Sequence, residues 1–318
     1  MQAPINHFQF APFHFFLKVL DYILLPAYKG STLRGGFGHA FKKVVCVNKE
    51  RICGSCLLKE KCVYSYVFET PPHSDTSRMR KYPYAPHPFV ITPPLEESRE
   101  YGKGETLCFE LTLIGKSIDY LPYFVYTFDE LGQIGLGKGK GRYQLEEVRS
   151  QKDRNKEETI YSSRDKILHK SFKVWNIEEL LESSSNTKTL TLNFITPTRL
   201  KFDGKLSSKL EFHILMRNVL RRISLLSYFH CDTDLDLDYK GLIERSQEIK
   251  VEKENLSWFD WERYSSRQET KMKMGGFIGS ITFRGDLEPF MPFLLLGEFI
   301  HAGKGTSFGL GKYQIMRN

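Results

Sequence analysis

The order of apolar stretches along the chain occurs twice. In the first half, an extended aromatic and aliphatic stretch at 7–22 precedes a segment at 33–45 whose apolar residues recur at three- and four-residue intervals. That spacing places them on one face of a helix. The second half repeats this order, with a strand-like stretch at 190–200 and helical spacing over 212–226. The pattern predicts two copies of one unit.

A glycine-rich loop and a short alternating strand end each copy. The segments 135–145 and 303–315 both contain Gly-Leu-Gly-Lys. Glycine allows positive φ and close approach of the backbone to a ligand, and the interleaved basic residues favour an anionic one, most simply a nucleic-acid backbone. The basic residues of these loops that we take as RNA-binding candidates are Lys138, Lys140, Arg142, Lys304 and Lys312.

This duplication predicts an α+β fold of two tandem ferredoxin-like (RRM-like) domains with glycine-rich loops and a small cysteine-rich insertion. A length of 318 residues is enough for two buried cores. We expect domains at 1–145, with the cysteine cluster at 46–62, and at 189–318. Between them, 146–188 alternates acidic and basic residues, which predicts a charged linker with a short helix near 175–181.

Charge and hydropathy limit the classes of partner that the protein can have. A formal net charge of +8 and a pI near 9.0 favour an acidic partner, although alone they imply only non-specific attraction. No run of about 18 uninterrupted apolar residues is present, and no basic segment leads into an apolar one at the N-terminus. We therefore expect a cytoplasmic protein with no membrane partner.

Four cysteines within seventeen residues form the sharpest local signal. They are Cys46, Cys53, Cys56 and Cys62. The two-residue gap between the second and third allows adjacent thiolates to chelate one ion, and four sulfurs fit tetrahedral zinc. Structural zinc is the favoured interpretation, while disulfides, an iron–sulfur cluster and a site without metal remain alternatives.

The predicted helix at 33–45 carries a candidate catalytic histidine. His39 projects from the side opposite the apolar residues, with Lys42 and Lys43 three and four positions later. At a pH near neutrality, a histidine can take or give a proton. Arg34, on the flank of the helix, could hold a phosphate. An exposed histidine beside lysines is, however, more often a solvated surface residue. Three helix-interior glycines suggest that a backbone or RNA strand passes close by: Gly35, Gly36 and Gly38.

The second predicted helix adds two basic residues at a four-residue interval, Arg217 and Arg221. They share one helix face and could line an RNA groove. Two arginines on a solvated face are an equally good interpretation.

Several motifs in a fixed order resemble the CRISPR-associated repeat-RNA processing endoribonucleases of the RAMP superfamily. The resemblance covers most of the chain apart from the charged linker. The segments that carry it are 29–40, the cysteine cluster running into 64–69, 87–91, 121–124 and the two glycine-rich loops.

The resemblance implies two ferredoxin-like domains, CRISPR repeat RNA as partner and cleavage without a catalytic metal. In that chemistry the ribose 2′-hydroxyl attacks the adjacent phosphate and leaves 2′,3′-cyclic phosphate and 5′-hydroxyl ends. A histidine after the first strand often acts with a tyrosine and a lysine in this family, so the catalytic candidates are His39, Lys43, Lys42 and Tyr28.

Two other classes of function remain open. Some members lack the histidine, so the chain could be a non-catalytic RAMP subunit that holds guide RNA beside other CRISPR effector subunits. A zinc-stabilised regulatory protein that binds DNA is the third hypothesis.

Overall fold

The computed structural model describes residues 7–48, 52–72, 76, 78–79, 81–153, 156–181, 188–207, 209–265 and 270–316. The chain divides into two compact units. We call residues 10–174 with 229–232 the N-terminal unit, and residues 175–228 and 233–318 with 1–9 the C-terminal unit. No helix in the described part of the chain is long and apolar enough to cross a membrane.

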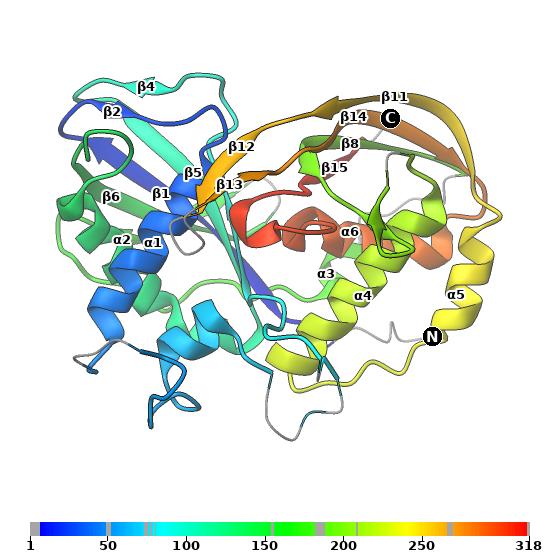
Figure 1. Ribbon diagram of the computed structural model, residues 1–318, viewed down its shortest axis with the longest axis horizontal. Helices are drawn as coiled ribbons and strands as arrows, with labels where there is room; N and C mark the ends of the chain where they lie inside the picture. The colour runs from blue at the N-terminus through cyan, green and yellow to red at the C-terminus, as the bar shows by residue number, and fades with distance from the viewer. Residues whose placement is uncertain are drawn as a thin grey trace. The chain divides into compact units, whose positions relative to one another are not determined.

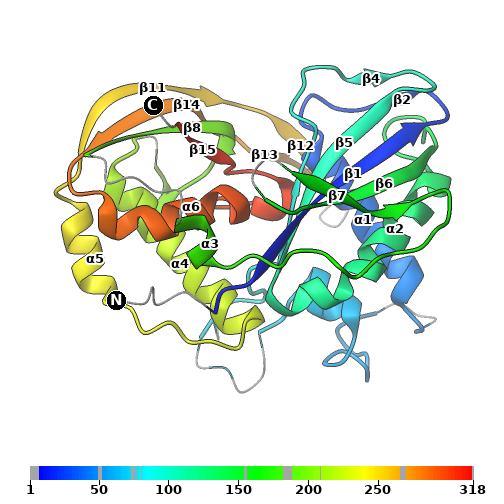
Figure 2. The same cartoon turned by 180° about the vertical axis from the view of Figure 1, so that it is seen from behind.

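The N-terminal unit is an antiparallel sheet with two helices packed on it (Figure 2). The sheet order is β3-β5-β1-β6-β7. Its main elements are β1 (Phe10–Val19), α1 (Gly30–Val45), β3 (Phe89–Thr92), β5 (Thr106–Ile114), α2 (Leu121–Ile134), β6 (Tyr143–Gln151) and β7 (Glu157–Ser162). Without β7, the chain order strand, helix, strand, strand, helix, strand is the ferredoxin-like motif.

Short elements complete this unit. They are the paired strands β2 (Ile23–Leu24) and β4 (Glu100–Tyr101), the π-helical turn η1 (Ser65–Glu69) and the 3₁₀ turn η2 (Gly115–Tyr120). The turn η1 belongs to the segment 46–88 between α1 and β3, which also contains the four clustered cysteines.

Aromatic rings fill the space between sheet and helices of the N-terminal unit. Phe37 on α1 stacks on Phe41, Phe124 and Phe128 with ring centroids 5.0, 4.9 and 5.2 Å apart. From the sheet side, Phe15 on β1 lies 5.2 Å from Phe128. All five rings are fully buried, and such pairs add about 0.5–1.5 kcal/mol beyond their area burial. The helical spacing of the apolar residues therefore fixes which face of α1 meets the sheet.

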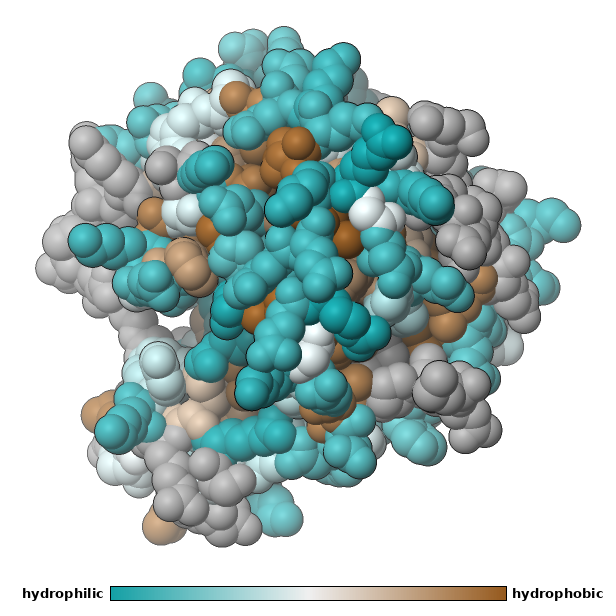
Figure 3. All heavy atoms as spheres, turned by 90° about the vertical axis from the view of Figure 1, so that its right-hand side faces the viewer, coloured by the Kyte–Doolittle hydropathy of each residue, from teal (hydrophilic) through white to brown (hydrophobic). Residues whose placement is uncertain are grey.

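The C-terminal unit repeats the motif (Figure 1). Its sheet order is β11-β14-β8-β15, all antiparallel. The main elements are β8 (Thr189–Thr198), α4 (Phe212–His230), β11 (Lys250–Phe259), β14 (Gly276–Arg284), α6 (Met291–Ile300) and β15 (Tyr313–Met316). Strand β11 is exposed along most of its length, and the side on which α5 (Tyr239–Ser246) and β11 lie is largely hydrophilic (Figure 3).

Smaller elements decorate the C-terminal unit. They are α3 (Ile177–Leu181), β9 (Lys201–Phe202), β10 (Lys205–Leu206), β12 (Glu262–Ser265), β13 (Thr270–Lys273) and the 3₁₀ turns η3 (Glu288–Phe290) and η4 (Thr306–Phe308). The helix α3 packs against α6, where the rings of Trp175 and Phe299 stack at 6.5 Å.

The predicted fold class is confirmed, because both halves form ferredoxin-like sheets that end in a strand after a glycine-rich loop. The charged linker differs from the expectation. Residues 146–174 belong to the N-terminal unit, where β7 is an edge strand of the sheet and pairs with β6. Apolar residues Val148 and Ile160 are buried there among charged neighbours. An edge strand with one solvated face resembles a polar linker in sequence.

Candidate functional site

One line of α1 faces solvent. Gly35, His39 and Lys43 follow at four-residue intervals and are all exposed, while the opposite face buries apolar residues including Leu33 and Phe37. Residues four apart on a helix are neighbours on its surface. This exposed line, which we call the His39 surface, therefore presents a histidine, a lysine and a glycine to solvent.

The first glycine-rich loop lies against α1. A Cβ added to Gly36 would sit 3.2 Å from Leu131 on α2 and 3.5 Å from Leu136 in the loop. The loop then crosses the chain at Leu24, whose carbonyl accepts a 2.9 Å hydrogen bond from the Lys138 backbone amide. Gly137, at φ 75°, lies too close to that carbonyl for any Cβ. Close backbone packing thus fixes the loop, and the side chains of Lys138 and Lys140 are exposed.

The helix glycines have different roles. A Cβ on Gly38 would fall within 3 Å of three atoms of the Phe68 ring, which belongs to η1, whereas a Cβ on Gly35 would have no neighbour within 4 Å among the described residues. Gly36 and Gly38 therefore serve internal packing. Of the three, Gly35 alone leaves open space for a ligand strand.

Alanine substitutions separate these two roles. Gly38→Ala is expected to lower the free energy of unfolding by about 1–2 kcal/mol, because the methyl group collides with a packed aromatic ring. Gly35→Ala is expected to raise it by about 0.5–1 kcal/mol through helix propensity. Urea denaturation of both variants measures the difference. Equal destabilisation by both would contradict this assignment.

Arg34 is held inside the N-terminal unit. Its Nη2 lies 2.8 Å from Nε2 of His87, and its guanidinium stacks 4.4 Å from the centre of the Phe68 ring. A guanidinium only donates, so His87 accepts at Nε2 and carries its proton on Nδ1, which donates to the Thr70 hydroxyl at 2.8 Å. That hydroxyl donates to the Ala85 carbonyl at 3.1 Å. These contacts fix the orientation of Arg34 and the neutral form of His87.

Sequence reasoning gave no role to His87. His87 begins one of the segments that carry the family resemblance, 87–91, but nothing in that segment identifies Arg34 as the partner.

Two predicted catalytic residues face elsewhere. The Lys42 ammonium lies 5.2 Å from the centre of the Tyr64 ring and contacts the Cys53 thiol, so its side chain points toward the cysteine segment. Tyr28 is buried, and burial raises its pKa well above the usual value. Neither lies on the His39 surface. The catalytic candidates that do lie there are His39 and Lys43.

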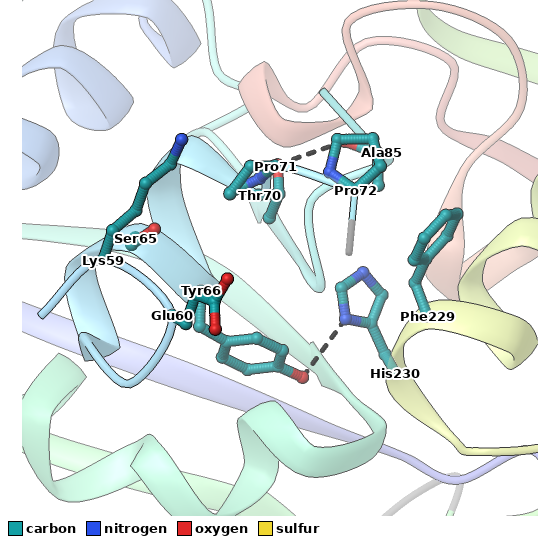
Figure 4. A pocket seen from close by; sticks show the side chains of 10 residues that line it. All are labelled: Lys59, Glu60, Ser65, Tyr66, Thr70, Pro71, Pro72, Ala85, Phe229 and His230. Atoms are coloured by element: carbon teal, nitrogen blue, oxygen red, sulfur yellow. Dashed lines mark hydrogen bonds between the residues drawn. The ribbon is translucent and has the colours of Figure 1, made fainter. Parts of the chain in front are cut away.

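A cavity of about 470 Å³ also lies in the N-terminal unit (Figure 4). At its wall, His230 donates from Nε2 to the Pro86 carbonyl at 2.8 Å, and its Nδ1 accepts from the Tyr66 hydroxyl at 3.1 Å. Burial raises the pKa of Tyr66 strongly. Both ring nitrogens of His230 are thus engaged by the protein, which favours a structural role for this pair over proton transfer.

The C-terminal unit gathers four cations, which we call the basic cluster: Arg199, Lys201, Arg221 and Lys304. Burial lowers the pKa of Lys304, and the positive charges of the other three lower it further. Backbone contacts hold the group together, because the Lys304 amide donates to the Arg199 carbonyl at 3.0 Å and Asn218 on α4 bonds both backbone groups of Lys201. Mutual repulsion of this kind is relieved by an anion.

The remaining predicted RNA-binding residues lie outside the basic cluster. Arg142 pairs with Asp21 at 2.6 Å on the surface. Arg217 is exposed, with its guanidinium 5.8 Å from the centre of the Phe202 ring. Lys312 is half-buried and acts electrostatically on Glu298. Of the residues predicted in this unit, Lys304 and Arg221 belong to the cluster; Arg199 and Lys201 were missed because they follow a strand, not a glycine loop.

Glu298 on α6 is expected to make the stability of the C-terminal unit depend on pH. Its Oε1 accepts a 2.7 Å hydrogen bond from the Ile315 amide, and burial raises its pKa to about 7. Because the unfolded pKa is lower, the native carboxyl binds the extra proton between about pH 4.5 and 7, and stability falls as the pH rises through that window. Glu298→Gln keeps the acceptor without the charge. It is expected to stabilise the protein by about 1–2 kcal/mol at pH 8 and negligibly at pH 4.5.

Thermal unfolding of both proteins at the two pH values checks this expectation. An equal difference in Tm at pH 4.5 and pH 8 would mean that the Glu298 charge does not matter.

The four clustered cysteines line one small cavity with Tyr64 and Lys59. All are free thiols, but no three ligand groups among the described residues are arranged to hold a metal ion as they stand.

Comparisons with known proteins agree with this architecture. Residues 8–172, about half of the chain, match the N-terminal domain family AF_1859_N, and residues 192–313 match the family CRISPR-associated endoribonuclease Cas6. An uncharacterised protein of Archaeoglobus fulgidus is 24% identical over 305 residues, 92% of each chain.

Solved Cas6 structures share the fold. A Cas6 product complex superposes with a TM-score of 0.58 at 18% identity, over 99% of this chain and 100% of that one. Thermus thermophilus Cas6 superposes with a TM-score of 0.56 at 17% identity, over 97% of this chain and 99% of that one. A chain of a partial Cas6-RT-Cas1–Cas2 complex superposes with a TM-score of 0.61 at 13% identity, over 99% of this chain and 47% of that one. The chain therefore belongs to the AF_1859_N family through its N-terminal half, and residues 192–313 match the CRISPR-associated endoribonuclease Cas6 family.

Proposed function

We propose that this protein cleaves CRISPR precursor RNA within its repeats by a metal-independent transesterification. The 2′-hydroxyl oxygen bonds to the adjacent phosphorus and loses its proton, while the bond from phosphorus to the 5′-oxygen breaks and that oxygen gains a proton. The products carry 2′,3′-cyclic phosphate and 5′-hydroxyl ends. The match of residues 192–313 to the Cas6 endoribonuclease family and the His39 surface support this proposal.

The exposed line on α1 is the observation that carries the proposal. His39 can perform one of the two proton transfers, and Lys43, one turn away, can stabilise the charge on the crowded phosphorane. Gly35 on the same line leaves room for the RNA backbone. Lys138 and Lys140, in the loop that packs on α1, supply further positive charge.

In this proposal, phosphates of the repeat RNA also bind to the basic cluster of the C-terminal unit. Four cations around a backbone-tethered loop suit a flexible polyanion, since each contacted phosphate releases condensed counterions. The glycine-rich loop lets the backbone turn at Gly303 and Gly305, both at positive φ, so that Lys304 projects between them.

Incubation of the purified protein with repeat RNA in EDTA tests the activity. A single cut that leaves a cyclic phosphate, and its loss when the scissile ribose carries a 2′-deoxy substitution, would support the proposal. Tight binding without a cut would favour the alternative, a non-catalytic RAMP subunit that holds guide RNA in an effector complex. Preference for duplex DNA over the repeat would favour a DNA-binding regulator.

We propose other CRISPR proteins as partners in either case. One solved structure with the same fold is a Cas6-RT-Cas1–Cas2 complex. Size-exclusion chromatography of the protein with proteins encoded beside its gene tests whether this chain also assembles.

A further inference from the structure

The segment 46–62 brings four thiols to one place. Cys46, Cys53, Cys56 and Cys62 line a single small cavity in the N-terminal unit. Two successive turns shape the segment, since the amide of Cys56 bonds the Cys53 carbonyl and the amide of Lys59 bonds the Cys56 carbonyl. Turns of this kind let two cysteines separated by two residues approach one ion.

This segment buries little apolar surface of its own. Val47, Ile52, Leu57 and Leu58 are 78%, 55%, 101% and 51% exposed. Its half-buried cysteines Cys53 and Cys62 are the residues that pack partly against the main core. A short segment with exposed apolar residues needs another source of order, and small folds commonly use a metal ion or disulfides for this purpose.

We infer that the four cysteines form a structural zinc site with an all-sulfur ligand set. Four thiolates fit the tetrahedral preference of Zn²⁺ and leave no open position for catalysis. Because no three of these groups stand at binding distances in the structure, the ion would draw the thiolates together around the cavity. Binding releases the thiol protons, so affinity for the ion falls as the pH is lowered.

The ion would stiffen both chain segments that support the His39 surface. Cys46 caps the C-terminal end of α1, and its amide bonds the Lys42 carbonyl. Three residues after Cys62, η1 begins, and its Phe68 packs on Gly38 and Arg34. Zinc would therefore close a loop that leaves α1 at one end and returns to its middle. This role is structural and independent of the chemistry on RNA.

Metal analysis of full-length protein purified without chelators tests the site. We expect about one zinc per chain, and a large loss of zinc in Cys53→Ser/Cys56→Ser. The matched control is Cys108→Ser/Cys231→Ser, which removes the two cysteines outside the segment and should keep the ion. Zinc removal should lower Tm and speed amide exchange in residues 42–46, while exchange in β8 stays unchanged.

A second measurement does not depend on folding of the variants. Co²⁺ added to zinc-depleted wild type should give the visible absorption of a tetrahedral thiolate complex. Absence of both zinc and this absorption would overturn the inference. Stoichiometric iron with charge-transfer absorption would overturn the zinc site in favour of an iron–sulfur cluster. Thiols that react with a thiol reagent only after reduction would overturn it in favour of disulfides. RNA cleavage is not a readout, so this result is separate from the proposed function.

Discussion

His39→Ala is expected to slow cleavage of repeat RNA by about 100-fold or more while changing repeat affinity by no more than a few-fold. General acid–base groups typically contribute 10²–10⁴ to the rate, and His39 is exposed on a helix face that the core does not use. Removal of the imidazole should therefore leave the fold intact. Single-turnover cleavage at saturating protein, with filter binding in parallel, measures both quantities.

The matched control for this substitution is His169→Ala. His169 is also an exposed histidine of the N-terminal unit, but it lies beyond β7 and away from α1 in the sequence, so its loss should leave the rate unchanged. A second comparison is Lys43→Arg against Lys43→Ala, where the retained positive charge should preserve more of the rate. Undiminished cleavage by His39→Ala would exclude His39 as the proton-transfer group.

The fold was predictable because its main signals are local. Helical spacing marks α1 and α4, and repeated glycine-rich loops mark the ends of both units. The edge hairpin of β6 and β7 was mistaken for a linker, since its solvated face carries the same alternating charges as a disordered segment. Periodicity alone cannot show that Val148 and Ile160 are buried between those charges.

The site was only partly predictable. Positions on one helix follow from its geometry, so the line through His39 and Lys43 could be drawn from sequence. Side-chain direction depends on distant segments, however, and here Tyr64 and Cys53 take Lys42 away from that line. The basic cluster joins residues about 100 positions apart, and no local pattern reports that Lys201 lies beside Lys304.

The second large effect is expected for Lys201→Ala/Lys304→Ala. Charge-assisted hydrogen bonds contribute about 1.5 kcal/mol or more each, so loss of two phosphate contacts should weaken repeat binding by at least tenfold at moderate salt. The dependence of log affinity on log salt should also become shallower by about 1.4, because each lost contact with single-stranded RNA removes about 0.7 from the slope. Titrations across a range of salt concentrations give both numbers.

Equal loss of charge elsewhere is the control. Lys240→Ala/Lys250→Ala removes two exposed lysines of the same unit that do not belong to the basic cluster, and we expect its salt slope to match wild type. Lys312→Ala should have a smaller effect than either cluster lysine, because Lys312 is half-buried and lies near Glu298. If the cluster variant and the control variant lose the same affinity and keep the same slope, the cations act only through net charge, and the cluster does not contact RNA phosphates.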